Sequence, residues 1–370
     1  MEFRLKLKRN SGKAFLIFSG LITGFIIFFA FGEIYLRMRS EYVIKKQQES
    51  TITGYDLELL YQMTPGGRRI KKNVDLIIKN HGPLKRDIRI TTNSNGFRDK
   101  ELDDFKSKDE IRILALGDSI TLGDYLNREE VYVERLEYYL NNAVKDKHIE
   151  VINAGVGSIG LEEEINILTK EGLKTKPDVV MIGFYLNDDA PPGGYPGETG
   201  YRNFFRRNSL VINNIYKYFI IRKWIVDNGI DPFKWYSVFE NSRWYADRND
   251  FMRMVEAADY DWGRAWKDEF WKKIESQFGQ LKQMSSDEKF KVVIVGFPVE
   301  FQVMAGFLEN TPQIKLAELS RRFGFQHIDL LEMLRSENEK ELYFDQVHPN
   351  IIANDMIGSY LADFFVKSVL

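Results

Sequence analysis

The sequence of 370 residues contains no cysteine, which excludes disulfide bonds, a cysteine nucleophile and thiolate metal sites. Only four histidines are present, which limits the candidates for a general base. The formal net charge of −2 gives no electrostatic reason to expect nucleic acid as a partner. We find no metal-ligand cluster and no nucleotide-binding glycine loop, so we expect no metal and no cofactor. The chain is 44% hydrophobic, which predicts one large domain with appendages.

A long hydrophobic run covers residues 14–32 without a single charge. As a helix it would extend about 28 Å at ~1.5 Å per residue, close to the thickness of the hydrocarbon core of a bilayer. Residues 1–13 carry basic side chains, which favours a cytoplasmic N-terminus. A cleaved signal peptide is the alternative, but the run is long for one and no clear cleavage site follows. We therefore expect a single-pass transmembrane helix, with the rest of the chain outside the cytoplasm.

Gly20 and Gly24 within this run match the small-xxx-small pattern through which membrane helices pair, so a homodimer contact there is one interpretation. An unpaired helix is the other, because glycines are common in membrane helices. Residues 33–54 are polar and charged and predict a helical stalk. Residues 55–108 contain turn signals around short alternating runs, which predict a small strand-rich segment packed on the main domain. The basic cluster at residues 68–72 of that segment could face anionic headgroups or an anionic glycan, but we expect a solvated face.

From about residue 109, short apolar runs alternate with helical patterns up to the end of the chain. Such alternation predicts a mostly parallel sheet covered by helices, an α/β three-layer sandwich over residues 109–370. The expected strands are 113–116, 150–153, 177–183, 290–297 and 326–329. The expected helices are 128–145, 161–172, 312–323 and a last one that ends near residue 366.

Between about residues 190 and 260 the alternation is interrupted, and all six tryptophans lie between Trp224 and Trp271. We predict a helical, aromatic-rich insertion above the carboxyl edge of the sheet. Its rings could serve a lid, a glycan platform or a membrane-contacting cap. We expect most of them to form the insertion's own core, with a few at the rim of the site, because Trp262, Trp266 and Phe270 have the spacing of one buried helix face.

Ser119 is the first candidate for chemistry, because it follows the apolar run 113–116 through Gly117 and Asp118. It therefore stands at the carboxyl end of a strand, where open α/β folds place their ligands. The alternative is a simple strand-to-helix turn in which Asp118 or Ser119 caps the next helix.

His348 is the natural general base. Pro349 is favoured in the first turn of a helix, so we expect His348 at a helix N-terminus, where the dipole keeps the imidazole neutral. Asp345, three residues earlier, can turn back and hold the other ring nitrogen. Such a base with its orienting partner is what a serine nucleophile needs.

Acyl transfer also needs hydrogen-bond donors directed at the developing oxyanion. Gly155 follows the second expected strand and Asn187 the third, so a backbone N–H and a side-chain amide could join the N–H of Ser119. The alternatives are a turn glycine at Gly155 and a helix cap or Asx turn at Asn187.

Together these pieces resemble the SGNH (GDSL-type) hydrolase family over about residues 109–367. The four matching blocks are Gly117–Thr121, Asn153–Gly155, Gly183–Asp188 and Asp345–Pro349. The resemblance implies a flavodoxin-like fold in which Ser119 is the nucleophile, supported by Asp118. It also implies that His348 is the base, Asp345 its partner, and Ser119, Gly155 and Asn187 the oxyanion hole. The anchor followed by residues 95–99 resembles a membrane-tethered bacterial branch of this family, whose minimal fold lacks the aromatic insertion.

We therefore expect a membrane-anchored serine esterase that acts in the periplasm or at the cell surface. Acyl groups, above all acetyl, on cell-surface or exported polysaccharide are the expected substrate, with lipid esters next. One alternative is an O-acyltransferase that passes the acyl group from the same site to a glycan. Another is a non-catalytic envelope scaffold or glycan-binding protein.

Overall fold

The computed structural model describes residues 2–48, 60–64, 66–79, 81, 84–103, 105–190, 209–227, 234–338 and 340–370. A five-stranded parallel sheet lies at its centre, with the strand order β6-β5-β7-β8-β9. The strands are β5 (Glu110–Gly117), β6 (His148–Asn153), β7 (Val179–Phe184), β8 (Lys291–Gly296) and β9 (Gln326–Asp329). This order is the flavodoxin-like one, so the predicted fold class is confirmed.

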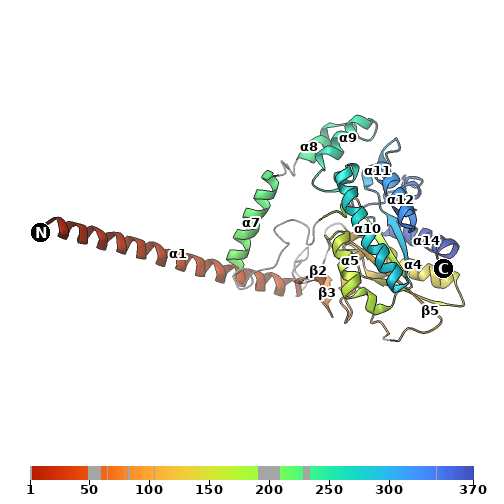
Figure 1. Cartoon of the computed structure of the whole chain (residues 1–370), viewed down its shortest axis with the longest axis horizontal. Coiled ribbons are helices and arrows are strands. Elements are labelled where there is room, and N and C mark those ends of the chain that lie inside the picture. The colour runs from red at the N-terminus through yellow and green to blue at the C-terminus, as the bar shows by residue number, and fades with distance from the viewer. Residues whose placement is uncertain are drawn as a thin grey trace.

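Helices cover both faces of this sheet, which makes three layers (Figure 1). Helix α4 (Tyr132–Ala143) packs against α14 (Ile351–Ser368), while α10 (Asp268–Glu288) packs against α5 (Leu161–Lys170) and α12 (Thr311–Phe323). The short helices are α3 (Ser119–Leu122), α11 (Glu300–Met304), α13 (Leu331–Arg335), η1 (Arg128–Glu130) and η2 (Gly172–Thr175). The expected helix from residue 128 is thus divided, because Val131 is extended between η1 and α4.

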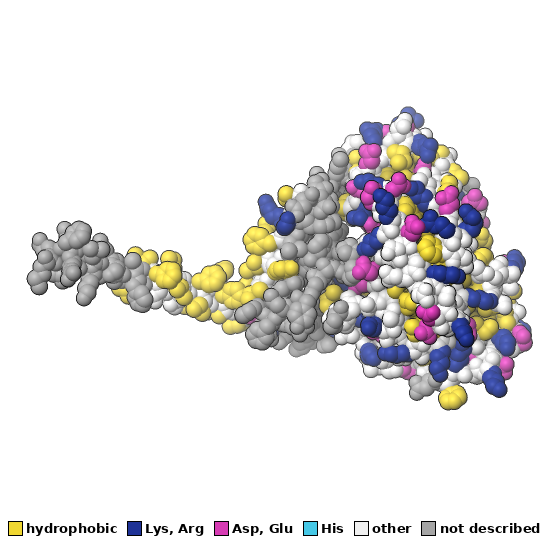
Figure 2. Space-filling model, in the orientation of Figure 1, with side chains coloured by type: hydrophobic (Ala, Val, Ile, Leu, Met, Phe, Trp, Pro, Cys, Tyr) yellow, Lys and Arg dark blue, Asp and Glu magenta, His cyan; other side chains and the backbone are white. Residues whose placement is uncertain are grey.

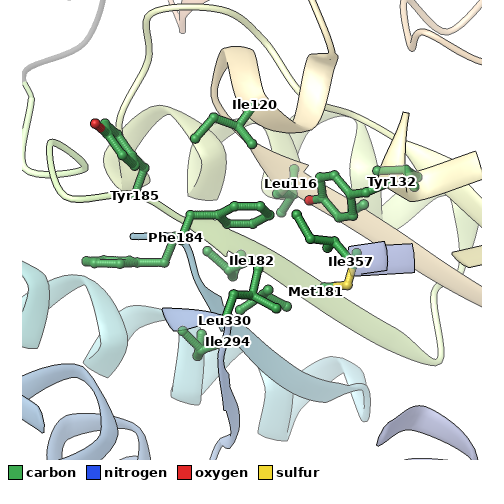
Figure 3. Close-up of a cluster of buried hydrophobic side chains, with 14 of the residues drawn as sticks. Leu116, Ile120, Tyr132, Met181, Ile182, Phe184, Tyr185, Ile294, Leu330 and Ile357 are labelled. Atoms are coloured by element: carbon green, nitrogen blue, oxygen red, sulfur yellow. The ribbon is translucent and has the colours of Figure 1, made fainter. Parts of the chain in front are cut away.

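The core of the sandwich is formed by apolar side chains from adjacent strands. Leu116, Ile182 and Ile294 lie on β5, β7 and β8, and each is fully buried. In Figure 3 they form one cluster with Tyr132 of α4 and Ile357 of α14. Strands buried on both faces are continuous apolar runs, which is why the sequence revealed them.

The segment before the main domain forms two small antiparallel sheets. Strand β1 (Tyr61–Thr64) pairs with β2 (Gly67–Ile70), and β3 (Asp75–Ile78) pairs with β4 (Ile88–Thr91). Ile70, Ile88 and Ile90 of these strands belong to the same buried cluster as the main sheet. The segment is therefore packed on the main domain and shares its core.

The expected solvated basic face at residues 68–72 is wrong for two of its members. Arg68 and Arg69 are buried. Arg68 donates to the carbonyl of Gly157 at 3.0 Å, and Arg69 pairs with the carboxylate of Glu171 at 3.3 Å. The two guanidinium groups thus join β2 to the main domain.

Helix α1 (Glu2–Gln48) is one continuous helix that projects away from the main domain (Figure 1). Its segment Leu16–Arg39 is long and apolar enough to cross a membrane. The Cα atoms of Gly20 and Gly24 lie in open space, with no other heavy atom near the position of a Cβ. These glycines therefore leave a surface that a partner could reach, and the homodimer stays a prediction.

The aromatic insertion is helical in its described parts, and residues 191–208 and 228–233 lie outside the described residues. It contains α7 (Leu210–Asp227), α8 (Lys234–Asn241), α9 (Arg248–Ala257) and η3 (Trp262–Trp266). Trp262 and Phe270 are buried, as the core interpretation expects. The single helix face expected for them is wrong, because Trp262 lies on η3 whereas Phe270 lies on α10.

Candidate active site

Ser119, His348 and Asp345 form a continuous hydrogen-bonded chain. Ser119 Oγ lies 2.9 Å from His348 Nε2, and His348 Nδ1 lies 2.9 Å from both carboxylate oxygens of Asp345. All three side chains are half-buried, so a substrate can reach them from solvent. A serine thus meets a histidine 229 positions away and the carboxylate beside it, in the arrangement of a nucleophile, its base and an orienting carboxylate.

The nucleophile is positioned by the end of β5. Gly117 has φ 158°, and a Cβ at this position would lie 2.1 Å from Oγ1 of Thr121, so a larger residue would displace α3. Asp118 then caps α3 by accepting the N–H of Ile120 at 2.8 Å, which makes Ser119 the first residue of the helix. The helix-cap interpretation of Asp118 therefore holds together with the catalytic placement of Ser119. Burial raises the pKa of Asp118 to about 6.

His348 does not lie at a helix N-terminus, which corrects the expectation drawn from Pro349. Helix α14 begins at Ile351 with Asn350 as its N-cap, so His348 belongs to the preceding turn. Asp345 closes this turn by accepting the backbone N–H groups of Val347 and His348, each at 2.8 Å.

The ionisation of His348 is governed by its neighbours instead of a helix dipole. Burial lowers the pKa of His348, but the hydrogen bond and charge of Asp345 outweigh it, and the pKa is raised. Burial likewise raises the pKa of Asp345, and its bonds to His348 reverse the direction, so that this pKa is lowered. The pair therefore favours an imidazolium next to a carboxylate, the state that a base next to a serine nucleophile would pass through.

Two residues outside the expected site hold the helix that carries Ser119. The fully buried Arg98 donates to the carbonyls of Leu122, at 2.6 Å, and of Gly123 and Leu126. Asn153 donates its amide to the carbonyl of Thr121 at 2.8 Å. Arg98 lies in the 95–99 stretch, so the signal was present in the sequence, but its contact with α3 depends on the tertiary fold.

Asn187 follows β7, the strand adjacent to β5, so it lies at the same edge of the sheet as Ser119. The chain continues from β5 toward one edge strand of the sheet and from β7 toward the other. Open α/β folds bind their ligands at such a point, beyond the carboxyl ends of the two strands. The amide of Asn187 donates to the carboxylate of Asp261, at the end of the insertion, at 2.8 Å. Burial raises the pKa of Asp261, while Asn187 and the charge of His348 oppose this. Sequence reasoning missed Asp261, because nothing local marks it.

Gly155 lies in the expected region but does not present a free donor. Its N–H donates to the side-chain carbonyl of Asn153 at 3.0 Å. A Cβ on Gly155 would lie 2.4 Å from the backbone nitrogen of Leu122, so this glycine allows the β6–α5 loop to pack against α3. Its role in the structure is therefore close packing beneath the nucleophile. In the same loop the exposed Ser158 has a φ of 59°, a conformation that few residues other than glycine adopt.

Tyr125 is a further residue of the site that the sequence did not indicate. Its ring packs against the ring of His348, with the ring centroids 4.5 Å apart. Burial and the neighbouring Asp345 carboxylate raise the pKa of Tyr125. A small cavity beside the nucleophile is lined by Ser119, Asp124, Tyr125 and His348.

Neither a family model nor a curated protein sequence matches the chain. Several solved structures are similar to it, at low identity. One is a two-domain esterase active on acetylated mannans, crystallised with mannopentaose, with a TM-score of 0.42 and 14% identity over 70% of this chain and 49% of that one. This chain thus spans about half of the length of that esterase.

A second similar structure is an acetyl xylan esterase, with a TM-score of 0.40 and 17% identity over 70% of this chain and 100% of that one. A third is a lipolytic protein of the G-D-S-L family from Desulfitobacterium hafniense, with a TM-score of 0.37 and 14% identity over 68% of this chain and 98% of that one. Esterases and lipolytic proteins of the GDSL (SGNH) type are the family that the four sequence blocks resemble. The function proposed below depends on the geometry of the site.

Proposed function

We propose that the protein is a serine esterase that works through an acyl-enzyme on Ser119. The observation that carries this proposal is the arrangement of Ser119 Oγ 2.9 Å from His348 Nε2, with His348 Nδ1 2.9 Å from Asp345. A nucleophile, a base within hydrogen-bond distance and a carboxylate that orients the base are the parts that acyl transfer requires. A scaffold or binding protein has no need for all three.

In the first half-reaction, Ser119 Oγ attacks the ester carbonyl while His348 Nε2 takes the hydroxyl proton. The tetrahedral oxyanion accepts hydrogen bonds from the backbone N–H of Ser119 and the side-chain amide of Asn187. The intermediate then collapses, the alcohol leaves with the proton from His348, and the acyl group remains on Ser119.

In the second half-reaction, water gives a proton to His348 and attacks the acyl-serine. The acid leaves, and the proton returns to Ser119. Throughout, Asp345 stabilises the imidazolium and holds the ring nitrogen that faces it.

The proposed substrate is an acyl group, most simply acetyl, on a cell-surface or exported polysaccharide. Two observations support it. The cavity beside Ser119 is small and partly open, and Tyr125 and His348 are among the residues that line it, so a short acyl chain is the simplest occupant. The apolar segment Leu16–Arg39 would hold the enzyme at a membrane, where exported polymers emerge.

For the location, we propose that α1 crosses the membrane with its N-terminus in the cytoplasm. The catalytic domain would then lie in the periplasm or at the cell surface. A membrane-impermeant maleimide tests this on intact cells, because the native chain offers it no thiol. Phe105 is 90% exposed, and the cysteine of a Phe105→Cys variant should react without permeabilisation. Reaction only after the inner membrane is opened would reverse the proposed orientation.

The test of the mechanism is labelling with a fluorophosphonate probe, which reacts with activated serines. We expect the wild type to be labelled and Ser119→Ala to remain unlabelled. His348→Ala should be labelled far more slowly, because Ser119 then lacks its base. Ser286→Ala is the matched control, since Ser286 is an exposed helical serine bonded only to a backbone carbonyl. Full labelling of Ser119→Ala would mean that the assigned nucleophile is wrong.

The same preparation distinguishes esterase from transferase. The esterase should release acetate from p-nitrophenyl acetate and from acetylated polysaccharide, at rates that added oligosaccharide leaves unchanged. Formation of acylated oligosaccharide at the expense of acetate would identify the O-acyltransferase instead. Absence of labelling and of turnover in the wild type would favour the scaffold.

A further inference from the structure

We infer that α7 (Leu210–Asp227), the first described helix of the insertion, is a membrane-surface helix that lies in the headgroup region beside the exit of α1. This inference rests on the membrane placement of α1 proposed above and does not depend on the esterase chemistry. Its occupant is the lipid bilayer itself. Three independent features of α7 support it.

The first feature is the exposure of apolar side chains on α7. None of its described side chains is buried, although the helix is rich in isoleucine and aromatic residues. Ile215, Tyr218 and Phe219 are 49%, 57% and 63% exposed, and Val226 is 70% exposed. In the main domain, isoleucine and aromatic side chains fill the core. The described apolar side chains of α7 instead form a surface that the rest of the protein leaves exposed.

The second feature is the attachment of α7 to α1. Glu33 accepts the backbone N–H groups of Leu210 and Val211, each at 3.1 Å, and the hydroxyl of Ser209 at 2.8 Å. Glu33 is the first charged residue after the apolar run 14–32. The N-terminus of α7 is therefore fixed at the first charged residue of the segment Leu16–Arg39, toward the end of α1 that is nearer the main domain.

The third feature is direction. In Figure 1, α7 runs across the axis of α1 instead of continuing along it, and the catalytic sandwich lies on the far side of α7. An α1 that crosses the bilayer would thus place α7 along the membrane surface. Figure 2 shows hydrophobic side chains along the described part of α1, and a Cβ on Gly32 of α1 would lie 3.4 Å from the side chain of Val211 on α7.

The composition of α7 suits the headgroup region more than the hydrocarbon. Arg222 and Lys223 are exposed near its C-terminal end, and Arg222 donates to the hydroxyl of Tyr218 at 2.9 Å. Tyr side chains gather at the membrane–water interface, and long basic side chains near them can extend toward the headgroups. Among the described residues, α1 alone has the length and composition of a membrane-spanning helix.

The absence of cysteine permits a direct test with the full chain. Single-cysteine variants at Phe219, Phe25 and Phe105 carry a nitroxide label, and each protein is reconstituted into phosphatidylethanolamine–phosphatidylglycerol vesicles. Phe25 lies in the apolar segment of α1, and Phe105 is an exposed residue just before β5. Power-saturation EPR then compares collisions of each label with oxygen, which concentrates in lipid, and with a water-soluble nickel chelate.

We expect the label at position 25 to favour oxygen strongly, the label at 219 to favour oxygen less strongly, and the label at 105 to favour nickel. A label at 219 that behaves like the one at 105 would overturn the inference, because α7 would then face water. Protection of position 219 from both reagents would also overturn it and would indicate a protein partner. An aqueous signal at position 25 would refute the membrane placement of α1 and with it the inference. Retained labelling of Ser119 by the fluorophosphonate in each variant verifies the fold and separates these outcomes from a failure of the esterase proposal.

Discussion

The side-chain amide of Asn187 donates to the carboxylate of Asp261 at 2.8 Å, across 74 positions of sequence. An amide nitrogen has two N–H donors, and the bond to Asp261 uses one of them. The other is the donor that the proposed oxyanion hole would use, and the bond to Asp261 restricts the orientation of the amide. The insertion thus contributes a positioning residue to the proposed oxyanion hole.

Asp261→Ala should lower kcat on the order of tenfold, with little change in KM, because Asn187 would lose the acceptor that orients it. This loss is smaller than the ~10²-fold to 10³-fold cost of deleting a hole donor. Asp261→Asn keeps an acceptor oxygen at the same place and should retain most of kcat. Steady-state kinetics with p-nitrophenyl acetate measure both variants. Unchanged kcat in Asp261→Ala would show that Asn187 needs no such support.

The pH dependence should follow His348. The base works in its neutral form, and the pKa of His348 is raised above its ordinary value by Asp345. The kcat/KM should therefore fall as the pH decreases through this raised pKa, with a midpoint above ~6.5.

Asp345→Asn removes the charge that raises the pKa of His348, so the acid limb should move to lower pH. It should also lower kcat by ~10²-fold or more, because the imidazolium loses its partner. Initial rates between pH 4 and 9 check both effects. An acid limb that stays in place would assign it to a group other than His348.

Arg98 should be essential for the stability of the nucleophile helix. Arg98→Met would leave the carbonyls of Leu122, Gly123 and Leu126 without this donor. At about 1 kcal/mol or more for each buried group, the expected loss is about 3 kcal/mol of unfolding free energy. The rate of fluorophosphonate labelling should fall as well, because Ser119 begins this helix.

Arg89→Met is the control for Arg98, since Arg89 pairs with Asp75 and both of these side chains are exposed. Its thermal unfolding should resemble that of the wild type. Equal melting temperatures for the two variants would contradict the role given to Arg98.

Gly155→Ala should disturb the site through packing alone. The added Cβ would lie 2.4 Å from the backbone nitrogen of Leu122 and 2.7 Å from the carbonyl carbon of Thr121, neither of which can rotate away. We expect a loss of about 1–3 kcal/mol and reduced activity. Gly279→Ala is the matched control, because Gly279 lies within the regular helix α10 and a Cβ there would approach only Phe323, at 3.8 Å. It should stabilise by a few tenths of a kcal/mol or more. Thermal unfolding in detergent compares the two.

The parts of the protein that the sequence predicted are those with a local cause. The apolar runs predicted the five strands, and the spacing of three residues predicted the contact between Asp345 and the ring of His348. Ser119 and Asn187 follow adjacent parallel strands, so their convergence at one edge was predictable from strand order alone. Pro349 misled the placement of His348, because the chain forms an isolated bridge between Pro349 and Tyr343 before α14 begins.

The parts that could not be predicted depend on contacts between distant segments. Asp261 is one of many acidic residues until the insertion folds back onto β7. Arg98 belongs to a recognisable stretch, but its carbonyl acceptors carry no side-chain signal. The helix α10 was not expected, because its start lies among the tryptophans that were assigned to the insertion.

The continuity of α1 has a consequence for what can reach Ser119. Beyond Glu33 the helix continues without a break to Gln48, which adds about 22 Å at ~1.5 Å per residue. It also contacts β3 of the small strand-rich segment. A continuous helix of this kind would hold the main domain at a fixed distance from the membrane, whereas a flexible linker would let the domain reach the bilayer surface. Under the proposed membrane placement, the site would lie above the bilayer surface, where it would meet long exported polymers more readily than lipid headgroups. The length of this helix thus supports glycan chains over membrane lipids as the proposed substrate.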